Sequence, residues 1–203
     1  MKKEPGADAV IDGGQTKNPS VNDFLQAFDE INADNVFVLP NNPNIFMSAN
    51  TAAELYKDSK IYVVPSTNIG QAYAALSMLD YTGTADEIAE RMQSDAQDVT
   101  TGMVTTSVRD ADINGVKIIK GNYVGFTDKT MLTCKKGKVD AAIDLISKLD
   151  GAEKVLLTAV YGVSATEEDR NELKNRVKEN FPDIEMYEID GGQEVYDFIL
   201  IIE

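Results

Sequence analysis

The sequence contains no histidine among its 203 residues. This absence excludes the Ser-His-Asp and Cys-His nucleophile systems and every zinc site with a histidine ligand. A general base working at neutral pH would have to be a lysine or a carboxylate with a strongly shifted pKa, for example Lys17 or Asp12. Most of the common forms of enzyme catalysis are therefore excluded, although catalysis as such is not.

The chain is also poor in cysteine and in long apolar runs. Its single cysteine, Cys134, excludes an intrachain disulfide and a cysteine-rich zinc site, so we expect no metal centre and a reducing, cytoplasmic location. No stretch approaches the roughly 18 consecutive apolar residues of a membrane span, so we expect no membrane insertion. The first ten residues lack the apolar region of a signal peptide.

Positive charge is scarce, with 19 Lys and Arg against 34 Asp and Glu and a formal net charge of -15. Such a chain should repel nucleic acid and anionic membranes, so neither is an expected partner. Acidity of this size is most often a device for solubility. The more specific interpretation is a basic partner protein.

The first half of the chain alternates short apolar runs with amphipathic segments. From Val21 to Ile31 the apolar residues recur at helical spacing, and Ser20 with Asp23 predicts a capping box at the start of this helix. The same strand-to-helix alternation occurs three times, which predicts a parallel sheet flanked by helices. The predicted strands are 7–12, 35–40 and 60–65, and the predicted helices are 21–32, 45–56, 69–79 and 84–97.

Near residue 100 the pattern changes to short strands separated by turn signals such as Asn114-Gly115. We therefore predict an α/β fold with two packed domains, residues 1–99 with a parallel sheet and residues 100–203 with a mixed sheet. Thr166 and Asp169 have capping-box spacing. In the second domain the predicted helices are 139–149 and 166–181, and the later predicted strands are 154–162, 184–190 and 195–203.

Three loops that follow the predicted strands of the first domain are rich in small polar residues. Ligands of parallel α/β sheets bind at the carboxyl ends of strands, where helix N-termini favour a carboxylate or phosphate. If the three strands are neighbours, these loops form one polar rim. The candidate ligand-binding residues are Gly14, Gln15, Thr16, Asn18, Ser20, Asn41, Asn42, Ser66 and Thr67.

The same residues have a purely structural interpretation, because Ser20, Asn44 and Thr67 or Asn68 are all plausible helix N-caps. The loops match neither a Walker A sequence nor a GxGxxG fingerprint, so no motif supports a nucleotide. The Asp110 to Asp112 turn resembles a calcium loop only superficially and is better interpreted as a solvated hairpin. No catalytic residue is predicted in this chain.

Several separated motifs occur in a recognisable order: GGQT-x-NPS, LPNN-x-NI, VVPSTNIGQAYAAL, TTSVRDADINGVKIIKGNYVGF and a final DGGQEVYDFILIIE. This order resembles the C-terminal region of DAK2-domain, YloV-like proteins. These are the dihydroxyacetone-kinase-like catalytic subunits of bacterial fatty acid kinase. The resemblance covers essentially the whole chain and also extends to the two-domain architecture of DegV-type fatty-acid-binding proteins.

The resemblance implies that this chain is the C-terminal fragment of a longer ATP-dependent kinase, a phosphotransferase, whose ATP and magnesium are bound by a helical domain absent here. We therefore expect no cofactor in the fragment and no phosphorylation by it alone. The implied function is docking of a DegV-like fatty-acid-binding protein, or oligomerisation, for example as a homodimer.

The alternative is a binding domain for a fatty acid, phosphate or hydroxyketone. By resemblance to the acyl-carboxylate loop of DegV-type proteins, its hydroxyls would be Thr16 and Ser20, with Ser66 and Thr67 nearby. The histidine that DegV-type proteins place near the carboxylate is missing from this chain.

Overall fold

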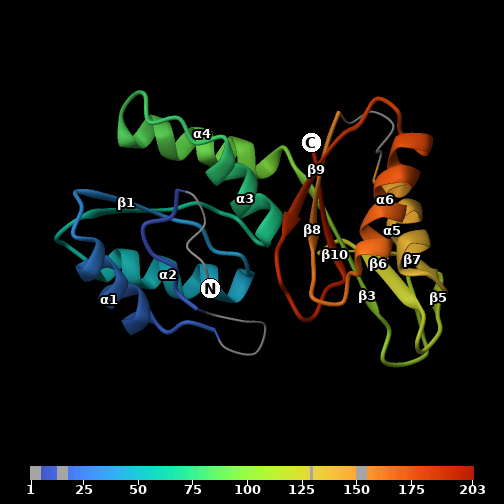
Figure 1. Ribbon diagram of the computed structural model, residues 1–203. Helices are drawn as coiled ribbons and strands as arrows, with labels where there is room; N and C mark the ends of the chain where they lie inside the picture. Colours follow the sequence, from blue (N-terminus) through green and yellow to red (C-terminus); the bar gives the residue numbers. More distant parts are fainter. Residues whose placement is uncertain (1–5, 13–17, 129, 150–154) are drawn as a thin grey trace. The chain divides into compact units, whose positions relative to one another are not determined.

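The computed structural model describes residues 6–12, 18–128, 130–149 and 155–203, and it divides into two compact units, Met1–Asp98 and Val99–Glu203. Each unit is a mixture of helices and strands (Figure 1). No helix in the described ranges is long and apolar enough to cross a membrane.

The first unit has two parallel strands between two layers of helices. Val36 faces the buried core formed with α1 and α2, while the adjacent Phe37 packs against the core formed with α3 and α4. The period-two alternation of a strand thus places successive side chains in different cores. The elements are α1 (Val21–Ile31), β1 (Asn35–Val38), α2 (Pro43–Leu55), β2 (Lys60–Val63), α3 (Ile69–Ser77) and α4 (Ala85–Gln97).

The helices of the first unit begin at side-chain caps. The predicted capping box of Ser20 and Asp23 is confirmed, and Thr84 forms a second box with Glu87 at α4. Helix α2 begins at Pro43, two residues earlier than predicted, because Asn42 rather than Asn44 is its N-cap and proline is favoured in the first helical turn.

The predicted strand 7–12 is wrong, because the described residues of this segment form no strand. Val10 is exposed, and Ile11 packs against the core of α1 and α2 without joining the sheet. The apolar run therefore reflects partial burial, which a short segment achieves without a hydrogen-bonded neighbour. The parallel sheet of this unit consists of β1 and β2.

The second unit contains a six-stranded mixed sheet in the order β7-β6-β3-β10-β8-β9. Strand β9 runs parallel to β8, and the other neighbouring pairs are antiparallel. The strands are β3 (Thr100–Thr106), β4 (Ala111–Ile113), β5 (Val116–Ile118), β6 (Tyr123–Phe126), β7 (Met131–Lys135), β8 (Leu156–Tyr161), β9 (Glu185–Asp190) and β10 (Phe198–Ile202). Strands β4 and β5 form a separate hairpin.

Helices α5 (Lys138–Lys148) and α6 (Glu167–Asn180) lie on one side of this sheet (Figure 1). Alternate residues of the central strands face them, so that Phe198, Leu200 and Ile202 share a core with Leu145 of α5 and Leu173 of α6. The capping box predicted from Thr166 and Asp169 is confirmed at α6.

Two glycines allow α5 to lie close to the sheet. An ideal Cβ on Gly102 would lie 2.8 Å from Cδ2 of Leu145 and 2.9 Å from Cδ1 of Leu149. A Cβ on Gly125 would lie 3.2 Å from Cβ of Leu145. Both spacings are closer than ordinary van der Waals contact, so the absence of a side chain at these positions is what makes room for Leu145.

Replacing Gly102 by alanine is expected to reduce the free energy of unfolding by about 1–3 kcal/mol, because the new methyl group overlaps Leu145 and Leu149. Leu145→Ala should cost about 2–5 kcal/mol by opening a cavity. The double variant should lose less stability than the sum of the two single losses, since the shortened side chain at position 145 makes room for the methyl group at position 102. Urea unfolding followed by circular dichroism measures all three, and strictly additive costs would show that the close approach is unimportant.

Candidate functional site

The predicted polar loops of the first unit supply the N-termini of its helices. The Ser20 hydroxyl accepts a hydrogen bond from the backbone N–H of Asp23 at 3.3 Å, and the Asp23 carboxylate accepts one from the N–H of Ser20 at 2.7 Å. Ser20 is exposed, as is Asn18. The remaining candidates of this loop, Gly14, Gln15 and Thr16, lie outside the described residues.

The next two loops use their polar side chains in the same way. The side-chain oxygen of Asn42 accepts a hydrogen bond from the N–H of Asn44 at 2.8 Å, and Asn41 beside it is exposed. The backbone N–H and the hydroxyl of Thr67 donate to the side-chain oxygen of Gln71 at 2.8 and 3.0 Å. These contacts occupy polar atoms that a ligand would otherwise use.

Ser66 brings two of the three predicted loops together. It is fully buried, and its hydroxyl donates a hydrogen bond to the carbonyl oxygen of Pro40. The parallel pairing continues just before this point, where the N–H of Val64 donates to the carbonyl of Val38 at 2.9 Å. The carboxyl ends of β1 and β2 are therefore neighbours, as expected of adjacent parallel strands, and the Ser66 hydroxyl links the two loops that follow them.

The second unit contains a buried ionic network that sequence reasoning missed. The Lys138 ammonium lies 3.1 Å from the carboxylate of Asp169 and 3.4 Å from that of Asp197, and it donates to the carbonyl of Ser164 at 2.7 Å. The side chains of Lys138 and Asp197 are only 13% and 7% exposed. The Ser164 hydroxyl donates to Asp197 at 2.6 Å.

Opposing effects set the charge states of this network. Burial disfavours the ammonium form of Lys138, but the hydrogen bond to Asp169 and the charge of Asp197 outweigh it and raise the pKa of Lys138. Burial also disfavours the charged form of Asp169, but the Thr166 and Lys138 hydrogen bonds outweigh it and lower the pKa of Asp169. The network is fully paired and links the starts of α5 and α6 to the start of β10, so its role is structural.

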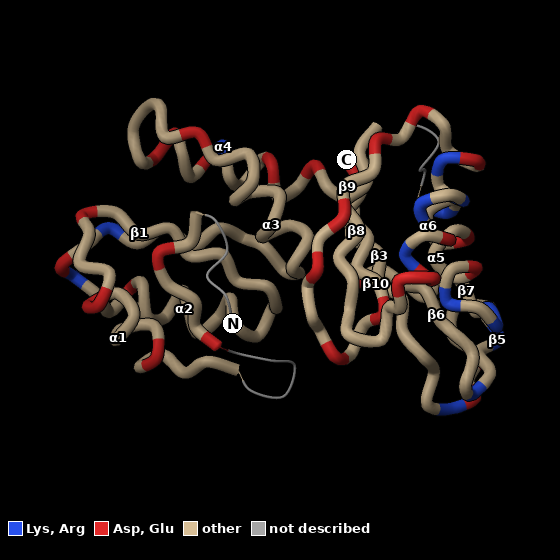
Figure 2. Tube along the Cα trace, in the orientation of Figure 1, with Lys and Arg blue, Asp and Glu red and all other residues tan. Residues whose placement is uncertain are grey.

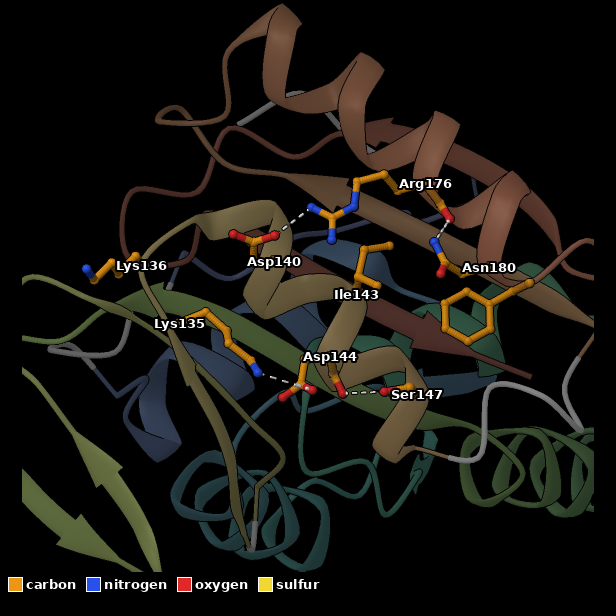
Figure 3. Close-up of a pocket in the computed structure, with 9 residues that line it drawn as sticks. Lys135, Lys136, Asp140, Ile143, Asp144, Ser147, Arg176 and Asn180 are labelled. Atoms are coloured by element: carbon orange, nitrogen blue, oxygen red, sulfur yellow. Dashed lines mark hydrogen bonds and ion pairs between the residues drawn. The ribbon is translucent and has the colours of Figure 1, made fainter.

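A groove of about 450 Å³ runs over α5 and α6 and has a mixed-charge lining (Figure 3). Arg176 pairs with Asp140 at 2.7 Å, and Lys135 lies 3.5 Å from Asp144. Most of the charged groups at the groove are thus neutralised by neighbours. Its lining residues are Lys135, Lys136, Asp140, Ile143, Asp144, Ser147, Arg176, Asn180 and Phe181.

Within the described ranges, no group of three or more Cys, Asp or Glu side chains is placed to hold a metal ion. The turn that resembles a calcium loop closes a hairpin, because the carboxylate of Asp110 accepts a hydrogen bond from the backbone N–H of Lys120 at 2.7 Å. Cys134 is a free, half-buried thiol on β7.

Solved structures show which class of protein this fold defines. A fatty acid kinase B3 protein from Streptococcus pneumoniae, loaded with linoleic acid, matches 91% of this chain and 76% of its own length, with a TM-score of 0.67 and 18% identity. A DegV family protein from Corynebacterium glutamicum matches 96% of this chain and 87% of its own length, with a TM-score of 0.67 and 14% identity. The chain therefore has the α/β fold of the DegV-like proteins.

Sequence comparison gives the family. The chain belongs to the FakA-like C-terminal family, the C-terminal region of the FakA-like subunits of fatty acid kinase, whose family model matches residues 1–203. Protein YloV of Bacillus subtilis is 37% identical over 201 residues, and an uncharacterized protein of Staphylococcus haemolyticus is 31% identical over 198 residues. These matches cover 99% and 98% of this chain but only 36% of each relative.

Ser66→Ala is expected to reduce the free energy of unfolding by about 1–3 kcal/mol, because the buried Pro40 carbonyl loses its hydrogen-bond donor. Ser94→Ala, a matched change at an exposed position of α4, should alter stability by less than about 0.5 kcal/mol. Denaturant unfolding of both variants makes the comparison. An unchanged stability for Ser66→Ala would mean that the hydrogen bond to Pro40 does not stabilise the loop.

The stability of the second unit should fall as the pH is lowered through the acid range. The pKa of Asp144, Asp169 and Glu188 is lowered in the folded chain by hydrogen bonds and neighbouring cations that outweigh burial. Their contribution is therefore complete above the ordinary carboxyl pKa and is lost as the pH falls through the lowered values.

Urea unfolding between neutral and acid pH measures this dependence. Asp144→Asn should make the dependence shallower, because it removes one of the three groups. Asp183→Asn, a change of the same kind at an exposed loop position, should leave it unaltered. Equal slopes for Asp144→Asn and the parent chain would contradict the assignment.

Proposed function

We propose that this chain is a non-catalytic docking region of a fatty acid kinase subunit, and that it binds a DegV-like fatty-acid-binding protein. In this proposal the kinase reaction, with its ATP and magnesium, belongs to the part of the relatives that lies outside the matched 36%. The docking region presents the carrier of the bound fatty acid to that part. It acts as a receptor for the carrier and performs no chemistry of its own.

One observation carries the proposal. The chain belongs to a family described as the C-terminal region of FakA-like fatty acid kinase subunits, and it shares its fold with a protein described as fatty acid kinase B3 loaded with linoleic acid. A kinase divided between two kinds of protein needs a surface on one that holds the other. A region that matches neither a Walker A sequence nor a GxGxxG fingerprint suits that task better than phosphoryl transfer.

The hydrogen bonds within the polar loops also support docking. Ser20, Asn42 and Thr67 cap or support helix starts, and Ser66 is buried against Pro40. Most of the described hydroxyls and amides that a ligand's carboxylate would use thus have partners within the chain. The same contacts explain why these residue types occur at these positions.

A second candidate function is binding of an acyl chain by this region itself. It is favoured by the fold shared with the linoleic acid-loaded protein and with a DegV fatty acid binding protein from Bacillus subtilis, which has a TM-score of 0.60 and 14% identity. In that case Thr16 and Ser20 would be the first residues to replace, because they are the hydroxyl-bearing residues that the resemblance to DegV-type proteins assigned to the acyl carboxylate.

The purified chain should form a heterocomplex with the DegV-like protein of the same organism. Native mass spectrometry and light scattering after size exclusion measure this, with the DegV-like protein in its lipid-loaded and lipid-free forms. An unrelated acidic protein of similar size is the control. A chain that forms no complex, alone or as part of the full-length protein, would contradict docking, and a co-purified acyl adduct would favour the second candidate.

A further inference from the structure

The charge of this acidic protein is unevenly distributed. Residues 107–138 contain seven Lys or Arg and three Asp, a formal charge of +4, so the rest of the chain carries -19. In Figure 2 the Lys and Arg of this segment lie around β5 and β7, whereas Asp and Glu occur throughout both units. Three of these seven cations, Arg109, Lys117 and Lys120, lie in or beside the β4–β5 hairpin together with Asp110 and Asp112, so residues 107–122 have a formal charge of +1 in a chain whose total is -15.

Strands β4 and β5 form a hairpin that is held in a defined shape. Its turn is Asn114-Gly115, with φ values of 54° and 78°, as required for a two-residue hairpin turn. At its base the N–H of Ser107 donates to the carbonyl of Asn122 at 2.7 Å, and the N–H of Gly121 donates to the carbonyl of Ser107 at 2.9 Å. A surface that is ordered before binding loses less conformational entropy on binding.

This hairpin exposes apolar side chains that its fold does not require. Val108 is 82% exposed, Ile119 47% and Ile113 38%. A shallow hollow of about 610 Å³ lies beside Ile119. Its lining includes Asp112 and Lys117, which are opposite each other in the register of β4 and β5. Exposed apolar side chains gathered on one element are typical of an interaction surface.

The cations of the hairpin lack ion pairs within the described part of the chain. Arg109, Lys117 and Lys120 are exposed and lie within 4.0 Å of no described carboxylate, whereas Lys138, Lys148 and Arg176 elsewhere in the unit are paired. Unpaired cations beside apolar side chains suit a protein face that has carboxylates around an apolar centre.

We infer that the β4–β5 hairpin, residues 107–122, is the docking surface for an acidic face of the DegV-like protein. This inference rests on the proposed docking function and assigns it a place. Nucleic acid fits less well, because a phosphate backbone offers no apolar surface to the exposed Val108, Ile113 and Ile119, and an anionic membrane is the alternative that the test below distinguishes. The cations raise the rate of encounter, and Val108, Ile113 and Ile119 supply the apolar contact.

The test is binding of the DegV-like protein from the same organism to the intact chain, measured as association rate and Kd at low and at high salt. The double variant Lys117→Glu/Lys120→Glu should raise the Kd by about tenfold or more, mainly through slower association. Its matched control is Lys57→Glu/Lys178→Glu, which changes the net charge equally at exposed lysines outside the hairpin. The control should change the Kd by less than about twofold.

Val108→Ser tests the apolar part, since a side chain 82% exposed contributes little to folding. It should raise the Kd at both salt levels. Circular dichroism confirms that each variant is folded.

Three results separate the ways in which the inference can fail. If the parent chain does not bind the DegV-like protein at all, the proposed function fails and this inference fails with it. If the parent binds and the hairpin variants bind equally well, docking stands and the hairpin assignment is overturned. If the hairpin variants lose only binding to phosphatidylglycerol vesicles, the surface is a membrane contact and the inference is also overturned.

Discussion

The second unit depends on the burial of β10 between β3 and β8. All five residues of this strand are buried, and both of its neighbours pair with it in antiparallel register. Strands β3 and β10 lie far apart in the sequence, so closing the sheet costs loop entropy that the burial of Phe198, Leu200 and Ile202 must offset. The helices, the ionic network of Lys138 and the peripheral strands are all attached to this central strand, directly or through its neighbours.

Local signals made much of this fold predictable from the sequence. The capping boxes of Ser20 and Thr166 specify helix starts through hydrogen bonds within four residues, and such short-range chemistry can be recognised in sequence. The change from strand–helix alternation to hairpins near residue 100 likewise indicated two kinds of sheet. The strand predicted at 7–12 failed because strand formation requires a neighbour, which sequence periodicity does not reveal.

The polar residues of the candidate sites show the same contrast between contacts made by nearby residues and contacts made by distant ones. Their positions at helix starts followed from the sequence, but the roles of Ser66 and Lys138 did not, because the first depends on Pro40 and the second on Asp169 and Asp197. Partners so distant in sequence become visible only in three dimensions. The described loop residues make hydrogen bonds within the chain, whereas the exposed apolar side chains of the β4–β5 hairpin are not explained by packing within its unit.

The close approach of α5 to the sheet has a consequence for sequence variation within the family. Because Gly102 and Gly125 both make room for Leu145, with Leu149 also against the first and Thr133 against the second, a bulkier residue at either glycine requires at least that position 145 has already become smaller. The three positions should therefore evolve together, with the helix residue changing first, and related sequences should show this covariation even where the overall identity is low.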